Sequence, residues 1–467
     1  HTRSYSVTGV RRVLFRSDTF YLPAADRVFF GKNSDRKPSE PQALVVVPPR
    51  EGSGPVRAGN RDFGLKDAGH AMALSCPTWM EGAEMGLNAA GVAIGNEAVF
   101  SRFKAAKNGV LGMDFLRAAL AASSTAQEAL EALIALTERF DQGGNGSYKG
   151  TLVYNNSYLI TGPDGAYVLE TAAKRWAWKQ LHGPSSISNS YSIQDDYKRV
   201  DPATRKAIAV VNERMACLDE ADAGRVSEKE SWKAYVEDKL MSRFSAGDAR
   251  RRAVTTLLGA AAEAGGRAAA LAVLRAHAAP DPEKPSRPRN VCNHDLDVVG
   301  SPTTSSMLVE YAPGGRTVLW FTGASYACSN VFKPVLLEDG RFRPLWVDYD
   351  YAEGGVAGGD YWLARREKAR RVRRNPKAAD AVASPRAEAP ARTFEGVERP
   401  AEGLGLRGGE ARRPRGAGER RQAARVAEAR RQLRARPGCF LRRGDAGRGR
   451  LEDLVVPGPE ADVVDLL

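Results

Sequence analysis

The chain has 467 residues, 43% of them hydrophobic, and a formal net charge of +13 at pH 7. This length predicts two to three domains, or one large domain with extensions. Residues 361–467 carry 26 of the 69 Lys and Arg residues but only 15 of the 56 Asp and Glu residues. The rest of the chain is therefore nearly neutral, which argues against nucleic acid as a partner of the core domain. No stretch approaches the roughly 20 apolar residues of a membrane span.

Cysteine and histidine usage narrows the chemistry. No Cys-x-x-Cys pair occurs, which argues against a zinc site, and no G-x-S-x-G motif marks a serine hydrolase of that type. An odd number of widely spaced cysteines favours a reducing compartment, and we expect a cytoplasmic protein. The cysteines are Cys76, Cys217, Cys292, Cys328 and Cys439.

Residues 1–16, HTRSYSVTGVRRVLFR, contain neither Met nor an apolar segment of signal-peptide length. They resemble translated sequencing-adaptor sequence, so we interpret them as a non-native leader that joins the chain at or near Ser17. A natural basic leader is the alternative.

The first half of the following sequence predicts strands and then helices. Residues 18–47 predict strand, turn and strand, and residues 70–76 and 90–99 predict further strands. The segment between them, PTWMEGAEMGLNAAG, is punctuated by Gly and predicts a loop. Residues 111–140 predict two helices, the second opened by a capping box from Thr125 to Glu128.

The second half repeats this pattern. Residues 157–181 predict a hairpin around a Pro-Asp-Gly turn, and residues 305–324 predict one around Pro-Gly-Gly. Helical spacing returns over about 228–278. Hairpins that alternate with helices indicate an α+β domain of antiparallel sheets covered by helices.

Residues 366–467 are rich in Arg, Ala, Gly and Pro and have few aromatic residues. Such a tail is predicted to be disordered, whether it is natural or an out-of-frame translation. A basic arm for nucleic acid or acidic membranes is one interpretation of it, but the arm lacks interleaved aromatic residues.

The stretch from Ser17 to Arg36 could carry chemistry. A hairpin over SDTF…FFGKNSDR returns near its start, so Lys32 and Asp35 could lie beside residue 17. If residue 17 were N-terminal, its α-amine, with a pKa of about 8, could act as a general base for its own side chain. Asp35 could orient that amine, and Lys32 could favour an anionic nucleophile. Taken alone, GKNSD favours a polar turn with solvated charges.

Three further positions are candidates. Asn96 and Asn189 could each donate a hydrogen bond to an oxyanion, although both also suit turns. Arg250 opens a helix in GDARRRAV and could bind a substrate carboxylate. For two of the three arginines in that run, a solvated helix face is the better interpretation.

Together these motifs resemble a known family. The order DTF, FGKNSDR, GAEMGLNAAGVAIGNEAV, GMDFLRAAL, VLETAAKRWA and ISNSYSI is similar to the secernin and bacterial dipeptidase family. These are N-terminal-nucleophile (Ntn) hydrolases, with choloylglycine hydrolases as distant relatives. The resemblance runs from about 17 to about 336 and implies an Ntn-hydrolase domain over 17–365.

The resemblance implies a fold and a set of roles. The fold is a four-layered αββα sandwich with a low-complexity C-terminal tail. Position 17 matches the nucleophile, Lys32 and Asp35 match residues beside it, and Arg250 matches a further active-site arginine. Asn96 and Asn189 match asparagines that bind the oxyanion and the amine.

The implied activity is amide-bond hydrolysis, with dipeptides as substrates, by a cysteine-type Ntn dipeptidase that needs no metal or organic cofactor. The chain departs from the family in two respects: position 17 is Ser where Cys is expected, and sixteen residues precede it. We expect that the natural Cys was lost at the join and that the chain as given is inactive without it. The alternative is a non-catalytic, secernin-like interaction protein on the same fold. The sequence is compatible with a monomer or an oligomer.

Overall fold

The computed structural model describes residues 17–37, 40–50, 54–58, 61–148, 150–221, 231–277, 290–294, 301–344 and 351–353. The chain divides into two compact units, His1–Arg399 and Pro400–Leu467. Every described residue belongs to the first unit. The predicted leader (1–16) and the predicted disordered tail (366–467) lie outside the described residues.

The first sheet has seven antiparallel strands in the order β12-β1-β2-β14-β15-β16-β17. Its second and third strands, β1 and β2, form a hairpin in which Asp18 pairs with Asn33. The strands are β1 (Asp18–Pro23), β2 (Val28–Asp35), β12 (Ser185–Ile187), β14 (Thr303–Tyr311), β15 (Thr317–Thr322), β16 (Lys333–Glu338) and β17 (Arg341–Pro344).

The second sheet has nine strands in the order β13-β11-β10-β9-β8-β7-β6-β3-β18, antiparallel except for the β18–β3 pair. The strands are β3 (Gln42–Val47), β6 (Met72–Pro77), β7 (Met85–Asn88), β8 (Ala93–Val99), β9 (Asn155–Gly162), β10 (Gly165–Ala172), β11 (Arg175–Gln180), β13 (Arg199–Val200) and β18 (Tyr351–Glu353). A separate hairpin is formed by β4 (Pro55–Ala58) and β5 (Arg61–Lys66).

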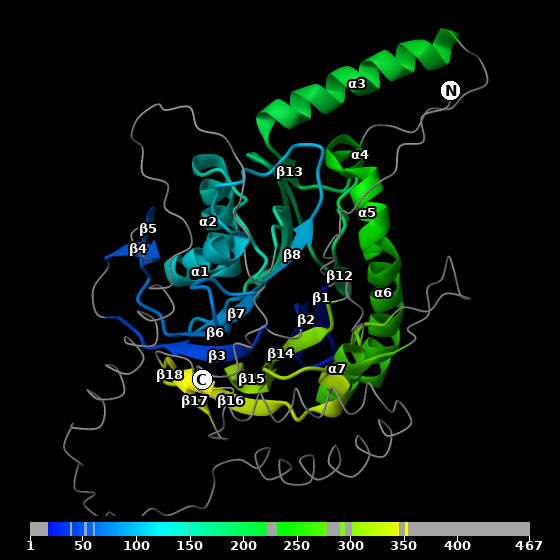
Figure 1. Ribbon diagram of the computed structural model, residues 1–467. Coiled ribbons are helices and arrows are strands. Elements are labelled where there is room, and N and C mark those ends of the chain that lie inside the picture. The colour runs from blue at the N-terminus through cyan, green and yellow to red at the C-terminus, as the bar shows by residue number, and fades with distance from the viewer. Residues whose placement is uncertain are drawn as a thin grey trace, which may run out of the picture. The chain divides into compact units, whose positions relative to one another are not determined.

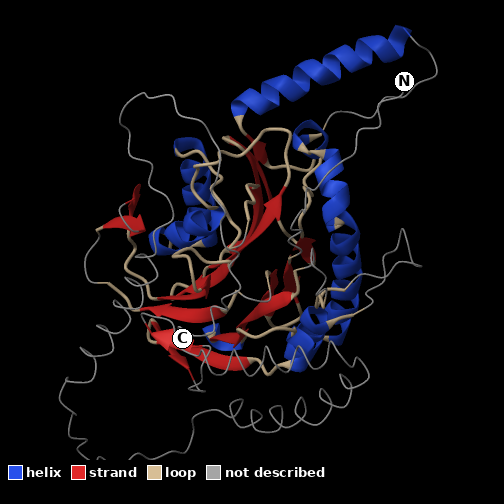
Figure 2. Ribbon diagram, in the orientation of Figure 1, coloured by secondary structure: helices blue, strands red, loops and turns tan. Residues whose placement is uncertain are grey.

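Helices cover the outer face of each sheet, as Figures 1 and 2 show: α1 and α2 lie on one side and α6 and α7 on the other. None of the described helices is long and apolar enough to cross a membrane. The helices are α1 (Gly112–Ala122), α2 (Ala126–Arg139), α3 (Pro202–Ala221), α4 (Trp232–Val236), α5 (Lys239–Ser245), α6 (Gly247–Ala264) and α7 (Gly266–Arg275), with short 3-10 turns η1 (Pro313–Gly315) and η2 (Ala327–Ser329).

Three large apolar clusters fill the space between the layers. Phe30 of β2, Leu159 of β9 and Met307 of β14 pack between the two sheets. Phe115 of α1 packs on the outer face of the second sheet, and Phe20 of β1 packs under α6 and α7. The predicted α+β class and the order helix, sheet, sheet, helix are therefore confirmed by the chain's own packing.

Most predicted elements are present. The predicted loop at 77–91 contains β7, and several elements were not predicted: the β4–β5 hairpin, α3 and the strands β12, β13, β16, β17 and β18. The expected polar turn at GKNSD is wrong, because β2 continues through Asp35 and Gly31–Asp35 are all buried. Polar side chains in a buried strand need specific partners, so this segment is a candidate for part of a functional site.

The predicted capping box of α2 forms in part. Thr125 is the N-cap, and its hydroxyl accepts a hydrogen bond from the Glu128 N–H at 3.1 Å. The Glu128 carboxylate accepts from the N–H of Ser124 at 2.7 Å and not from Thr125. Both hydrogen bonds stabilise the start of α2, but the returning bond from Glu128 reaches the residue before the N-cap and not the N-cap itself.

Gly31 is predicted to be intolerant of any side chain. A Cβ there would lie 2.2 Å from Cζ of the buried Phe20 ring, which covers Gly31 across the β1–β2 pair. We expect Gly31→Ala to lower the free energy of unfolding by about 1–3 kcal/mol in urea titrations. The control is Gly259→Ala in α6, where nothing lies within 4 Å, which should be neutral or stabilising by up to about 1 kcal/mol. Equal effects at the two sites would contradict the packing described.

Candidate active site

Ser17 lies immediately before β1 and is held through both of its polar groups. Its backbone N–H donates to Asn189 Oδ1 at 2.7 Å, and its Oγ accepts from the Asp35 N–H at 3.0 Å. The residue is 5% exposed. In the chain as given this nitrogen belongs to a peptide bond, but the contact fixes where an α-amine would lie if the chain began here.

Arg250 of α6 joins the segments around Ser17. Its Nη2 donates to Asn189 Oδ1 at 2.7 Å and to Ser188 Oγ at 2.8 Å, and it lies 3.5 Å from the Ser17 carbonyl oxygen. Asn189 in turn donates through Nδ2 to the Ala98 carbonyl at 3.0 Å. The Asn189 amide is therefore oriented with its oxygen toward residue 17, which suits holding an amine rather than stabilising an oxyanion.

Asp35, whose backbone N–H contacts the Ser17 hydroxyl, carries a buried carboxyl group. Its Oδ1 accepts from Thr303 Oγ1 at 2.6 Å, and the residue is 1% exposed. Burial raises its pKa well above the usual value, against the opposing effects of the Thr303 hydrogen bond and the Arg250 charge. Desolvation favours the neutral acid, so Asp35 can hold a proton where an exposed aspartate would not.

Lys32 forms a buried ion pair that was not predicted. Its Nζ lies 2.8 Å from Glu97 Oε1, both side chains are fully buried, and Thr19 Oγ1 donates to the same oxygen at 2.6 Å. Burial raises the pKa of Glu97 from 4.5 to about 7, although Lys32 opposes the shift. The pair links the two sheets directly beneath the start of β1.

Asn96 does not join this group. It precedes Glu97 in β8, and successive strand residues point to opposite faces. The Asn96 side chain donates to Asn156 Oδ1 at 3.0 Å, and Asn156 lies against Gly112 of α1. Asn96 therefore points to the helix-covered face, away from the residues around Ser17.

Hydrogen bonds thus join Ser17, Asp35, Asn189 and Arg250, whereas Lys32 contacts Glu97. As expected for the arginine run, Arg250 is buried while Arg251 and Arg252 are partly exposed. Sequence reasoning missed four contributors: Asp18, Glu97, Ser188 and Thr303. Asp18, Glu97 and Ser188 lie inside the quoted motifs, but selecting Asp18 and Glu97 requires knowing which face each strand turns inward.

Several buried polar atoms of this group lack hydrogen-bond partners among the described residues. They include both carboxylate oxygens of Asp18, Nε and Nη1 of Arg250, and Oε2 of Glu97. Arg250 Nε lies 3.8 Å from Asp18 Oδ1, which is an ion pair without a hydrogen bond. Unpartnered buried polar groups are uncommon in native proteins and often accompany bound water or a functional role.

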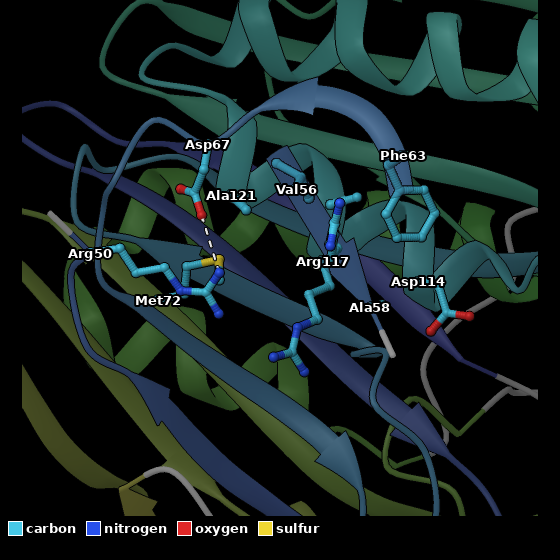
Figure 3. Close-up of a pocket in the computed structure, with 11 residues that line it drawn as sticks. Arg50, Val56, Ala58, Phe63, Asp67, Met72, Asp114, Arg117 and Ala121 are labelled. Atoms are coloured by element: carbon cyan, nitrogen blue, oxygen red, sulfur yellow. Dashed lines mark ion pairs between the residues drawn. The ribbon is translucent and has the colours of Figure 1, made fainter. Parts of the chain in front are cut away.

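A small cavity lies elsewhere, between the β4–β5 hairpin and α1 (Figure 3). It holds about 20 Å³, enough for about one water molecule, and Arg50 pairs with Asp67 at its edge at 3.6 Å. It contains none of the residues around Ser17 and offers no room for a substrate.

A group of possible metal ligands lies apart from these residues, although the spacing of the cysteines argued against a zinc site. His277, Cys292, His294 and Cys328 place one ligand atom each within 4.8 Å of one another. Among the described residues, no hydrogen bond joins any of the four to Ser17 or Arg250.

Comparison with known proteins gives a weak likeness. No protein-family model matches the chain. The chain is similar to a mutant of the conjugated bile acid hydrolase from Clostridium perfringens, with 14% identity over 71% of this chain and 97% of that chain and a TM-score of 0.42. A second variant of that hydrolase gives 13% identity, 72% and 98% coverage and a TM-score of 0.41. A Caenorhabditis elegans N-acylethanolamine-hydrolyzing acid amidase ortholog gives 11% identity over 62% of this chain and 91% of that chain, with a TM-score of 0.29.

Glu97 is predicted to make the stability of the protein depend on pH. Because its folded pKa is about 7 and its usual value 4.5, the folded state keeps a proton that the unfolded chain has released between these values. The contribution of Glu97 to the free energy of unfolding therefore falls as pH rises through this range. In urea titrations at about pH 5 and about pH 8, wild type should lose more stability than Glu97→Gln. The exposed Glu131→Gln should behave as wild type; parallel profiles for all three would contradict this assignment.

Proposed function

We propose that the group around residue 17 is the active site of an amide-bond hydrolase whose N-terminal residue is the nucleophile. The observation that supports this most is the pair of contacts at Ser17. Asn189 Oδ1 holds its nitrogen and the Asp35 N–H holds its side-chain oxygen. A base and a nucleophile that belong to one residue are thereby fixed relative to each other, which removes the need for a histidine.

The proposed chemistry starts from a chain that begins at residue 17 with Cys. The thiol gives its proton to the α-amine, sulfur attacks the scissile carbonyl, and a tetrahedral adduct forms. The ammonium then protonates the leaving nitrogen as the carbon–nitrogen bond breaks, and water hydrolyses the thioester and restores the thiol. The Arg250 guanidinium, held near the same nitrogen, favours the neutral amine that this base role requires.

Dipeptides are the proposed substrate class. A dipeptide carries a free carboxylate, and Arg250 Nη1 has no hydrogen-bond partner among the described residues. A charge-assisted hydrogen bond from this nitrogen could hold that carboxylate. The resemblance to the secernin and bacterial dipeptidase family supports the same class, and the αββα layers match the fold which that resemblance implies.

A comparison of three versions of the chain tests the proposal. The first is the chain as given, the second begins at residue 17 with Ser17→Cys after removal of an initiator Met, and the third begins there with Ser17→Ala. Each is assayed on unblocked dipeptides and on the same dipeptides with amidated C-termini. We expect hydrolysis by the second version alone, its loss on thiol alkylation, and weaker hydrolysis of the amidated set.

Two outcomes would overturn the proposal. Equal hydrolysis by the Ser17→Cys and Ser17→Ala versions would show that residue 17 is not the nucleophile. A folded Ser17→Cys version that cleaves nothing in the panel would favour the non-catalytic interaction protein on the same fold. Circular dichroism and a cooperative unfolding transition establish that each version is folded.

A further inference from the structure

Two thiols and two imidazoles lie close together near the C-terminal end of α7. His277 follows α7, Cys292 and His294 lie in the segment 290–294, and Cys328 lies in η2. One ligand atom from each lies within 4.8 Å of all the others. Cys292 is buried, His294 and Cys328 are partly buried and His277 is exposed. A cluster that opens to solvent on one side has a path for an ion to enter.

The distances between these ligand atoms suit one tetrahedral ion. Cys292 Sγ lies 3.5 Å from His294 Nε2, and His294 Nε2 lies 3.2 Å from Cys328 Sγ. Zinc bonds of about 2.0–2.3 Å place neighbouring ligand atoms of a tetrahedron about 3.3–3.8 Å apart. A set of two sulfur and two nitrogen ligands is typical of zinc among the divalent metals.

The backbone that carries these ligands is held in place independently. The N–H groups of Val291 and Cys292 both donate to the Ala276 carbonyl, at 3.1 and 3.0 Å. Asn33 of β2 donates through Nδ2 to the carbonyls of Leu274 and Val291, both at 2.9 Å. The His277 and Cys292 segments are thus tied together without any ion, as a pre-organised site requires.

The other two ligands are fixed by a stacked ring and by an arginine. The His294 ring stacks on Tyr326 with 4.1 Å between centroids, and Tyr326 has φ 72°, an uncommon conformation for an aromatic residue. Arg275 at the end of α7 donates to the carbonyls of Ala327 and Asn330, at 3.3 and 3.2 Å. Backbone strain next to Cys328 persists only where its surroundings enforce it.

We propose that His277, Cys292, His294 and Cys328 bind one zinc ion through all four side chains. On binding, both thiols lose their protons to solvent and four metal–ligand bonds form, so the charge of the ion is neutralised by two thiolates. Four protein ligands leave no open position, which makes this a structural site rather than a catalytic one. It joins three segments that are distant in sequence.

The site is also connected to the region around residue 17. The Asn293 N–H donates to Thr303 Oγ1 at 2.9 Å, and that hydroxyl donates to Asp35 Oδ1 at 2.6 Å. Asn293 lies between the two ligands Cys292 and His294. Zinc binding would therefore hold the segment that positions Thr303, and through it the buried Asp35 carboxyl.

The test measures metal in the full-length chain purified from zinc-supplemented medium under reducing conditions. We expect about one zinc ion per chain by mass spectrometry of metals, and at least a tenfold loss in Cys292→Ser/Cys328→Ser. The matched control is Cys76→Ser, a buried cysteine of β6 outside the cluster, which should keep its zinc. Equal zinc content in the double variant and the control would overturn the proposal.

A second arm does not depend on the variants folding. The wild-type chain is stripped with a chelator and titrated with Co²⁺ alone. We expect saturation at one equivalent, with thiolate-to-cobalt charge-transfer bands and the d–d intensity of four-coordinate cobalt. A folded chain that binds no cobalt, or one whose cobalt spectrum lacks thiolate bands, overturns the proposal. So does an intact mass that shows Cys292 and Cys328 joined as a disulfide in the reduced preparation.

Discussion

The buried guanidinium of Arg250 is the constraint on which the candidate active site depends. A charge at 4% exposure is tolerated only with partners, and Arg250 finds them in Asn189, Ser188, the Ser17 carbonyl and Asp18. These partners come from the start of β1 and from the segment after β12, so α6 can pack on the first sheet only when the segments converge. The position of residue 17 follows from that convergence.

Strand alternation determines which polar residues share this site. In β1, Thr19 turns toward the second sheet while Asp18 turns toward α6, and in β8 Glu97 faces inward while Asn96 faces α1. The sequence predicted the strands themselves from their apolar runs. It could not predict which face each residue occupies, because that depends on pairing between strands far apart in the chain. For this reason the sequence predicted a role for Asn96, although its neighbour Glu97 is the residue that faces the site.

The four-ligand cluster was missed for a related reason. Zinc sites are found in sequence by short, regular spacing, whereas His277, Cys292 and Cys328 are brought together only by α7, the 290–294 segment and η2. By contrast, Lys32, Asp35 and Asn189 were predicted because they occur in motifs that resemble a family, and Arg250 was predicted from the run of arginines that opens a helix and from a looser match to that family. Each of these residues also had a structural interpretation without a function. For Lys32 and Asp35 that interpretation was a solvated polar turn, which their burial in β2 rules out. Local pattern predicts elements well and long-range clusters poorly.

Direct detection of an acyl group on residue 17 tests the central claim. The version that begins at residue 17 with Ser17→Cys is mixed with an aminoacyl ester, quenched in acid within the first turnovers, and measured by intact mass and peptide mapping. The account predicts an added aminoacyl mass on the cysteine introduced at residue 17, present during turnover and lost when the substrate is exhausted. Turnover with no adduct, or an adduct on Cys328 or Cys292 instead, would contradict it.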